Sequence, residues 1–188
     1  VEETPITEVS RSDFGRSITT QAGTPPNDLY QTAMALYEQG HYVEAGEQLR
    51  TLLTHEPKNT QAMTLLARAD ADRGRLDTAL TWCEKAMAVD KLNPVCYYLR
   101  ATILQEQGQL EDAVQSLKRA LYLDSHFVLA HFALGNLARQ QGKSREADKH
   151  LQNALQLLRD YQPQDVLPES EGITAGRLEA IITSMTQR

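Results

Sequence analysis

The sequence has little of what marks a disulfide framework, a metal site or a membrane protein. Its 188 residues include two cysteines and one tryptophan, and aromatic residues make up only 6%. Cys83 and Cys96 form no CxxC pair, and both lie in stretches of helical periodicity, so we interpret them as buried thiols of a cytoplasmic protein. No apolar run approaches the roughly 18 residues of a membrane-spanning helix, so membrane insertion is not expected.

An excess of basic residues is also absent. The chain carries 19 Lys and Arg against 25 Asp and Glu, whereas a nucleic-acid binder normally presents a basic face. There is no G-x-S-x-G motif, no glycine-rich phosphate loop and no cysteine paired with a base. The histidines form no metal-ligand pattern, since His126 and His131 are not the i, i+4 pair of a helical zinc site. We therefore expect no catalytic residue, no metal and no nucleic-acid partner.

The first 26 residues are rich in serine, threonine and proline, and their apolar residues show no period. Such a segment cannot bury enough apolar surface to offset the entropy of ordering it, so residues 1–26 are predicted to be a disordered linker. The chain opens on Val1 rather than methionine and shows no signal peptide, which suggests a piece of a longer protein.

A repeat of constant length follows this segment. Four glycines lie 34 residues apart, each followed five positions later by an alanine: Gly40, Gly74, Gly108 and Gly142, with Ala45, Ala79, Ala113 and Ala147. A fixed period of this length is typical of stacked helical hairpins. Glycine readily adopts the positive φ of a helix end, so each glycine is expected to end the first helix of a hairpin. The pattern predicts helices near 28–39, 43–55, 61–73, 77–89, 95–107, 111–123, 128–141 and 145–160.

Other positions of the repeat explain how the two helices of a hairpin would pack. One position always holds a small residue, which lets the helices approach closely: Ala33, Ala67, Ala101 and Gly135. Asn27, Asn59 or Thr60, and Asn93 are expected to start helices as N-cap residues, the last followed by Pro94 at the first helical position.

These features resemble the tetratricopeptide repeat (TPR) family over residues 27–160. The resemblance implies an all-α fold, a right-handed superhelix of four helix-turn-helix repeats at 27–59, 60–93, 94–127 and 128–160. Two features depart from the family's pattern. The proline usual near the end of a repeat survives only as Pro57. The position that often holds an aromatic residue is occupied by Leu29, Met63, Tyr97 and His131.

The end of the chain is predicted to cap this stack. Residues 161–172 are rich in turn formers and are predicted to be an extended linker. Residues 173–187 are predicted to form a helix with one apolar face, made of Leu178, Ile181, Ile182 and Met185. An open stack exposes the apolar face of its last hairpin, which such a helix would cover. The alternative is that this helix docks another domain.

In a TPR superhelix the first helices of the repeats line the inner face, which forms a groove. Aromatic and arginine side chains often carry binding energy in a recessed surface, so the groove is expected to bind a protein or peptide with apolar side chains. The alternative is that the aromatics only pack neighbouring helices. The candidate groove residues are Tyr30, Met34, Tyr37, Thr64, Arg68, Tyr98, Thr102, Gln105, Phe132, Asn136 and Arg139.

Some members of the family grip the carboxylate of a chaperone tail ending in EEVD with lysine, arginine and asparagine side chains. The matching inner positions here hold Tyr30, Met34, Leu65, Val95 and Leu99. A buried carboxylate without a cationic partner is unfavourable, so an EEVD-type tail is not an expected partner. Two charged residues stand at helix-facing positions, and we expect Asp70 and Arg100 to form an ion pair between consecutive first helices; the alternative is that either side chain reaches solvent.

The segment from Val166 to Leu178, which contains SEGITAGRL, resembles the closing stretch of chemotaxis-receptor (protein-glutamate) methyltransferases that carry a C-terminal repeat module. The resemblance implies a parent enzyme with an S-adenosylmethionine-dependent domain before this chain, and no cofactor within it. The repeats would then bind the chemoreceptor, a signalling protein or the enzyme's own catalytic domain, and tune which receptor sites are methylated. The alternative is a free-standing TPR adaptor in assembly, secretion or chaperone work.

Overall fold

The computed structural model describes residues 26–186, in which the chain forms nine α-helices. They are α1 (Pro26–Glu38), α2 (Tyr42–His55), α3 (Thr60–Asp72), α4 (Leu76–Val89), α5 (Pro94–Glu106), α6 (Leu110–Leu123), α7 (Val128–Gln140), α8 (Ser144–Leu158) and α9 (Ala175–Thr186). The only β pairing in this range is a single bridge between Val166 and Thr174. The predicted linker of residues 1–26 lies outside the described residues except for Pro26, at which α1 begins.

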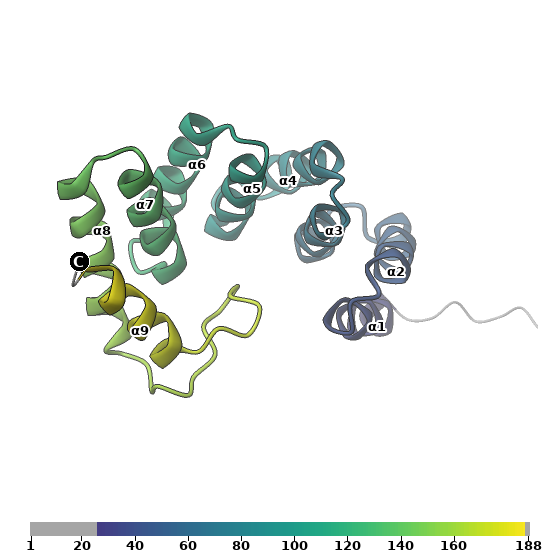
Figure 1. Ribbon diagram of the computed structural model, residues 1–188. Coiled ribbons are helices and arrows are strands. Elements are labelled where there is room, and N and C mark those ends of the chain that lie inside the picture. The colour runs from purple at the N-terminus through teal and green to yellow at the C-terminus, as the bar shows by residue number, and fades with distance from the viewer. Residues whose placement is uncertain (1–25, 187–188) are drawn as a thin grey trace, which may run out of the picture.

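The first eight helices form four antiparallel hairpins that stack side by side into an arch (Figure 1). Helices α1, α3, α5 and α7 lie on the inner side of the arch, and α2, α4, α6 and α8 lie on its outer side (Figure 1). Each hairpin packs against the next, chiefly through its outer helix and the inner helix that follows. The all-α superhelix of four repeats is confirmed, and its helix bounds agree with the predicted ones to within two residues.

The repeated glycines end the inner helices as predicted. Gly40, Gly74, Gly108 and Gly142 have φ between +73° and +80°, and a Cβ would meet nothing there within 4 Å, so only the backbone conformation requires glycine. The predicted caps are correct for α3 and α5: Asn59 accepts from the amide of Ala62, and Asn93 from that of Val95. Asn27 is not a cap, because α1 already begins at Pro26.

Small residues bring the helices of each hairpin together. Ala33, Ala67 and Ala101 are fully buried, and Gly135 takes the same place in the last repeat. At Gly135 the contact with α8 is so close that a Cβ would lie 2.7 Å from two carbon atoms of Leu151.

The terminal helix α9 covers the last hairpin, as predicted. It packs on α8, and Leu178 and Ile182 are fully buried in the same core cluster as Leu151 and Leu158. The apolar face is narrower than predicted, since Ile181 is exposed. The helix begins two residues later than expected because the two residues before it pair with the strand-like segment at Val166.

The predicted ion pair between Asp70 and Arg100 is wrong. Asp70 is buried and lies 3.6 Å from a guanidinium nitrogen of Arg50 in α2 and 3.7 Å from one of Arg73. Arg100 instead donates to the hydroxyl of Ser116 in α6. The position of Asp70 on its inner helix faces the preceding outer helix, and that of Arg100 faces the outer helix of its own repeat. Consecutive inner helices therefore do not bring the two side chains together.

Candidate functional site: the concave groove

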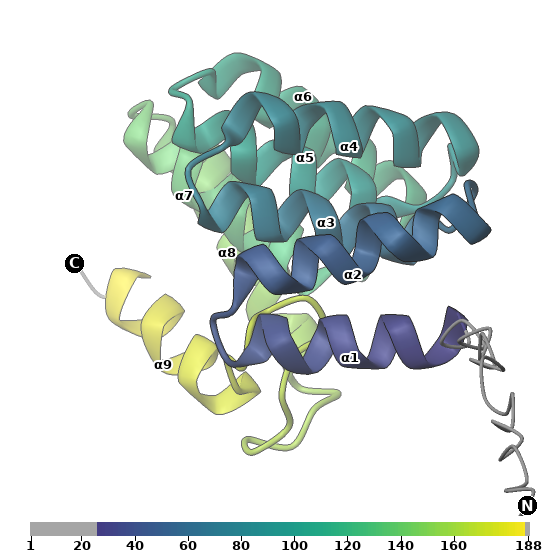
Figure 2. The same ribbon diagram turned by 90° about the vertical axis from the view of Figure 1, so that its right-hand side faces the viewer.

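The inner helices line a hollow surface that the end of the chain enters. After α8 the chain turns back, and residues 161–174, which we call the strap, run under the arch before α9 begins (Figures 1 and 2). The sequence predicts an extended linker over 161–172, whereas the structure folds 163–164, 168–169 and 171–172 into turns. The position of this segment in the groove was not predicted. The strap separates two cavities, both lined by inner-helix side chains on one side and by strap residues on the other.

The first cavity, of about 450 Å³, lies between the strap and helices α1 and α3. It brings together five of the predicted groove residues: Tyr30, Met34, Tyr37, Thr64 and Arg68. Gln61 and Leu65 of α3, Asn93 and Val95 also line it.

The second cavity, of about 310 Å³, lies on the other side of the strap against α3, α5 and α7. Among the predicted residues it contains Tyr98, Thr102 and Phe132, and it shares Arg68 with the first cavity. Of the remaining candidates, Gln105 and Asn136 line neither cavity. Arg139 is engaged elsewhere, because its guanidinium donates to the carbonyl of Met185 at the end of α9, at 2.7 Å.

Two glutamates attach the strap to the inner helices. Glu169 forms an ion pair with Arg68 of α3, in which both side chains are less than one-third exposed. Glu171 accepts a hydrogen bond from the hydroxyl of Tyr37 in α1, at 3.2 Å. These contacts join residues 101 and 134 positions apart in the sequence, so no local pattern could have indicated them.

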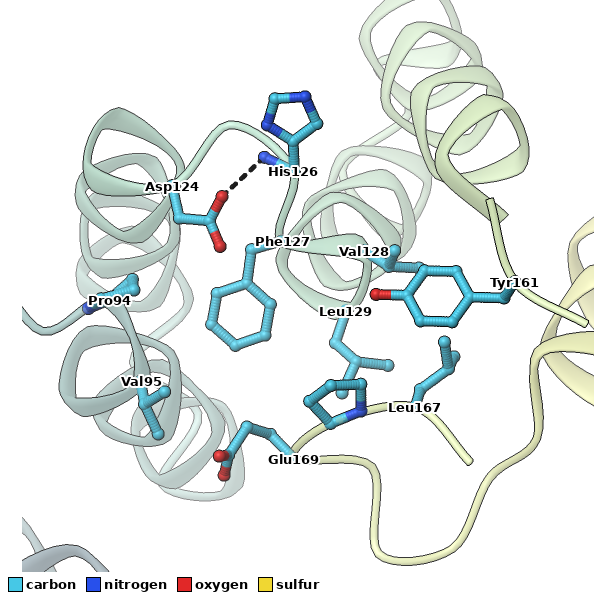
Figure 3. Close-up of a pocket in the computed structure, with 11 residues that line it drawn as sticks. Pro94, Val95, Asp124, His126, Phe127, Val128, Leu129, Tyr161, Leu167 and Glu169 are labelled. Carbon is cyan, nitrogen blue, oxygen red and sulfur yellow. Dashed lines mark hydrogen bonds between the residues drawn. The ribbon is translucent and has the colours of Figure 1, made fainter. Parts of the chain in front are cut away.

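An apolar contact fixes the strap beside α7. Leu167 is 2% exposed, and a smaller cavity of about 140 Å³ beside it is lined by Phe127, Leu129 and Tyr161. Figure 3 shows these three side chains around this space, whereas the imidazole of His126 points away from it. Phe127 also packs against Tyr98, with ring centroids 4.9 Å apart.

The strap is a closed loop with a strained tip. At its base the amide of Leu167 donates to the carbonyl of Ile173 at 3.0 Å, and the hydroxyl of buried Ser170 donates to the carbonyl of Leu167 at 2.7 Å. Glu169 and Glu171 have φ of +64° and +55°. A left-handed conformation is unfavourable for residues with a Cβ, by roughly 1–2 kcal/mol each, so the contacts of the strap must offset this strain.

The groove is acidic around the tip of the strap. Burial raises the pKa of Glu106, and the neighbouring charges of Asp72 and Glu171 raise it further. Burial is also the main cause that raises the pKa of Tyr37, aided by Asp72 and Glu171. Arg68 is the one cation that lines either cavity. The described residues include no group of three His, Cys, Asp or Glu suited to a metal ion.

Comparison with known proteins identifies the family of the repeats. Three family models match the chain, described as tetratricopeptide repeat over residues 36–103, TPR repeat over 101–142 and tetratricopeptide repeat over 130–165. Residues 36–165 belong to the TPR family. TPR modules are non-catalytic and bind other proteins, so this part of the chain is a protein-interaction module. No curated protein matches the sequence closely enough to be a relative.

Solved structures show the same fold. A MamA fragment from Desulfovibrio magneticus RS-1 is 23% identical, with a TM-score of 0.64 over 73% of this chain and 78% of that one. Another MamA crystal structure is 16% identical, with a TM-score of 0.62 over 86% of this chain and 88% of that one. The first TPR of Spaghetti (RPAP3), bound to the HSP90 peptide SRMEEVD, is 21% identical, with a TM-score of 0.59 over 62% of this chain and 93% of that one. Within residues 26–186 no helix is long and apolar enough to cross a membrane.

Proposed function

We propose that the chain is a scaffold that binds an extended polypeptide along its concave face. The observation that supports this proposal is the strap itself, since a looped segment of polypeptide already lies against the inner helices. It is held there by an arginine, a tyrosine hydroxyl and an apolar contact. The two cavities beside it leave space for further side chains. The chemistry of this surface suits recognition and includes no activated nucleophile.

The partner is not expected to be a tail ending in EEVD, although RPAP3 is similar in fold and binds such a peptide. Of the residues at the matching inner positions, Tyr30, Met34 and Leu65 line the first cavity, and none carries a positive charge. Arg68, the one cation that lines this cavity, already pairs with Glu169, so a terminal carboxylate bound beside the strap would lose its hydration without gaining a free cation.

A substitution that fills the first cavity tests the proposal. Thr64 lines that cavity and is half-buried, and its hydroxyl donates to the carbonyl of Thr60, four residues earlier. Thr64→Arg should fill the cavity and abolish retention of a partner once that partner has been identified. The matched control is Thr81→Arg on α4, where an exposed hydroxyl also donates to the carbonyl four residues earlier, at 3.0 Å. Equal retention by both variants would contradict the proposal.

A second candidate function follows from the sequence of the tail. We propose that the chain acts as the regulatory region of a chemoreceptor glutamate methyltransferase, because residues 166–178 resemble the end of such enzymes. In this chain those residues form most of the strap and the start of α9. They would therefore keep the strap in the groove. S-adenosylmethionine would be bound by a preceding domain, and no residue described above would contact it.

Two observations separate the two candidates. A methyltransferase domain encoded directly before Val1 would support the second, and a start codon there would exclude it. The rate and the site pattern of receptor methylation should then change when Thr64→Arg is introduced into the full-length enzyme, whereas Thr81→Arg should leave both unchanged. Unchanged methylation with Thr64→Arg would contradict the regulatory role.

A further inference from the structure

The strap meets the concave face as a bound peptide would, but its fit is incomplete. We propose that the strap occupies the ligand site in cis, and that the groove is built for a peptide segment with an apolar residue, an acidic residue two positions later and a basic residue two positions after that. A partner of this chemistry would displace the strap. This inference rests on the proposed function of the concave face and adds the ligand class and its regulation.

The first two elements of this pattern come from the contacts of the strap. Leu167 is buried in the same apolar cluster as Phe127 and Leu129, next to the smaller cavity, and Glu169 follows it by two residues. The carboxylate of Glu169 pairs with Arg68, which lines both cavities and is therefore at the centre of the groove. An arginine that is mostly removed from water favours a carboxylate partner, so a competing peptide needs an acidic residue at this place.

The third element comes from a mismatch. Glu171 gains one hydrogen bond, from Tyr37, but it lies among the carboxylates of Asp72 and Glu106. Like charges on a partly buried surface repel one another, and the raised pKa of Glu106 reflects this repulsion in addition to burial. A lysine or arginine at the place of Glu171 would turn this repulsion into attraction.

The backbone conformation of the strap also favours its displacement by a peptide. Glu169 and Glu171 both adopt positive φ, a conformation that the loop imposes so that its two ends can meet at the bridge between Val166 and Thr174. A peptide added in trans has no such closure to satisfy and avoids this strain. The strain of the strap therefore favours its displacement.

Peptide binding to the complete 188-residue chain tests this inference. The probes are a fluorescent peptide with the strap sequence, Val-Leu-Pro-Glu-Ser-Glu-Gly-Ile, and the same peptide with Glu171→Lys. The hosts are the wild type, Glu169→Ala and the double variant Glu169→Ala with Arg68→Ala. Glu169→Ala removes the ion pair of the strap and leaves the hydrogen bonds at its base, so the open groove should be populated more often.

The lysine peptide should bind about tenfold more tightly to Glu169→Ala than to the wild type, because apparent affinity rises with the open fraction. It should also bind more tightly than the strap-sequence peptide, and Arg68→Ala should abolish binding. Thermal unfolding of each host serves as the control for folding. Equal affinity for the wild type and Glu169→Ala, or for the two peptides, would overturn the inference.

The outcome for the partner distinguishes this inference from the proposed function. If Thr64→Arg abolishes retention of the natural partner while neither peptide binds any host, the groove binds polypeptides but the ligand pattern is wrong. If Thr64→Arg leaves partner retention unchanged, the proposed function itself fails.

Discussion

Replacing Gly135 by alanine should destabilise the last repeat, although the same change usually strengthens a helix. In the interior of a helix, Gly→Ala contributes about 1 kcal/mol of stability through helix propensity. At Gly135, however, the new Cβ would lie 2.7 Å from Cγ and Cδ2 of Leu151 and 3.4 Å from the carbonyl oxygen of Ala147. Carbon atoms prefer a separation of about 3.5–4.0 Å, so Leu151 or the helix must move by nearly 1 Å.

Leu151 is 1% exposed and sits in the core shared by α7, α8 and α9, so it has no free space to enter. Overpacking of this kind costs about 1–3 kcal/mol. After the gain in propensity is subtracted, we expect Gly135→Ala to lower the free energy of unfolding by up to about 2 kcal/mol. For a chain of this size, that corresponds to a decrease of up to roughly 8 °C in the melting temperature.

Gly46 provides the matched control. It is also buried within a helix, but a Cβ there would first meet the end of the flexible Arg50 side chain, at 3.2 Å. Gly46→Ala should therefore be neutral or stabilise the protein by up to about 1 kcal/mol. Urea unfolding followed by circular dichroism measures both variants. A Gly135→Ala protein as stable as the Gly46→Ala protein would refute the packing argument.

Three further predictions concern parts of the chain away from the groove. Burial lowers the pKa of His131 and His150, whose Nδ1 atoms are 3.0 Å apart, so the unfolded chain binds more protons than the folded one at low pH. The free energy of unfolding should therefore fall as the pH drops below about 6.5. Over the same pH change, the urea midpoint of His150→Gln should decrease less than that of the wild type. Burial raises the pKa of Cys83 to about 12 and that of Cys96 to about 11, so a thiol reagent at pH 8 should label them only at the rate of unfolding; rapid labelling would contradict their burial. Arg139→Ala removes the hydrogen bond from the guanidinium to the end of α9, so amide exchange should accelerate in α9 but not in α1. The same exchange rate in α9 of the variant and the wild type would show that this hydrogen bond is dispensable.

The repeat architecture was predictable because its signals are local and occur four times. The positive φ of Gly40 and Gly74 follows from the requirement of a helix end, and the burial of Ala33 and Ala67 follows from helix packing within one hairpin. Each of these arguments needs only residues within one repeat. The cap formed by α9 was predictable in the same way, since an exposed apolar end of a stack must be covered.

The contents of the groove were not predictable, because they depend on single contacts between distant residues. Nothing near Glu169 in the sequence indicates Arg68 as its partner, and a turn-rich segment is compatible with many paths. The predicted pairing of Asp70 with Arg100 was wrong for a related reason. Sequence spacing places a residue on a helix face but does not decide which neighbouring helix that face meets. Arg139 was assigned to the groove on its position alone, whereas α9 takes it as a hydrogen-bond donor.

Hydrogen exchange of the 188-residue chain, measured with and without its partner, tests the central claim most directly. If the concave face is the binding surface and the strap is its internal ligand, the partner should slow exchange in α1 and α3. It should at the same time speed exchange of the strap amides, beginning with the Leu167 amide that now donates to Ile173. Slower exchange confined to the outer helices α2, α4 and α6, with the strap unchanged, would contradict it.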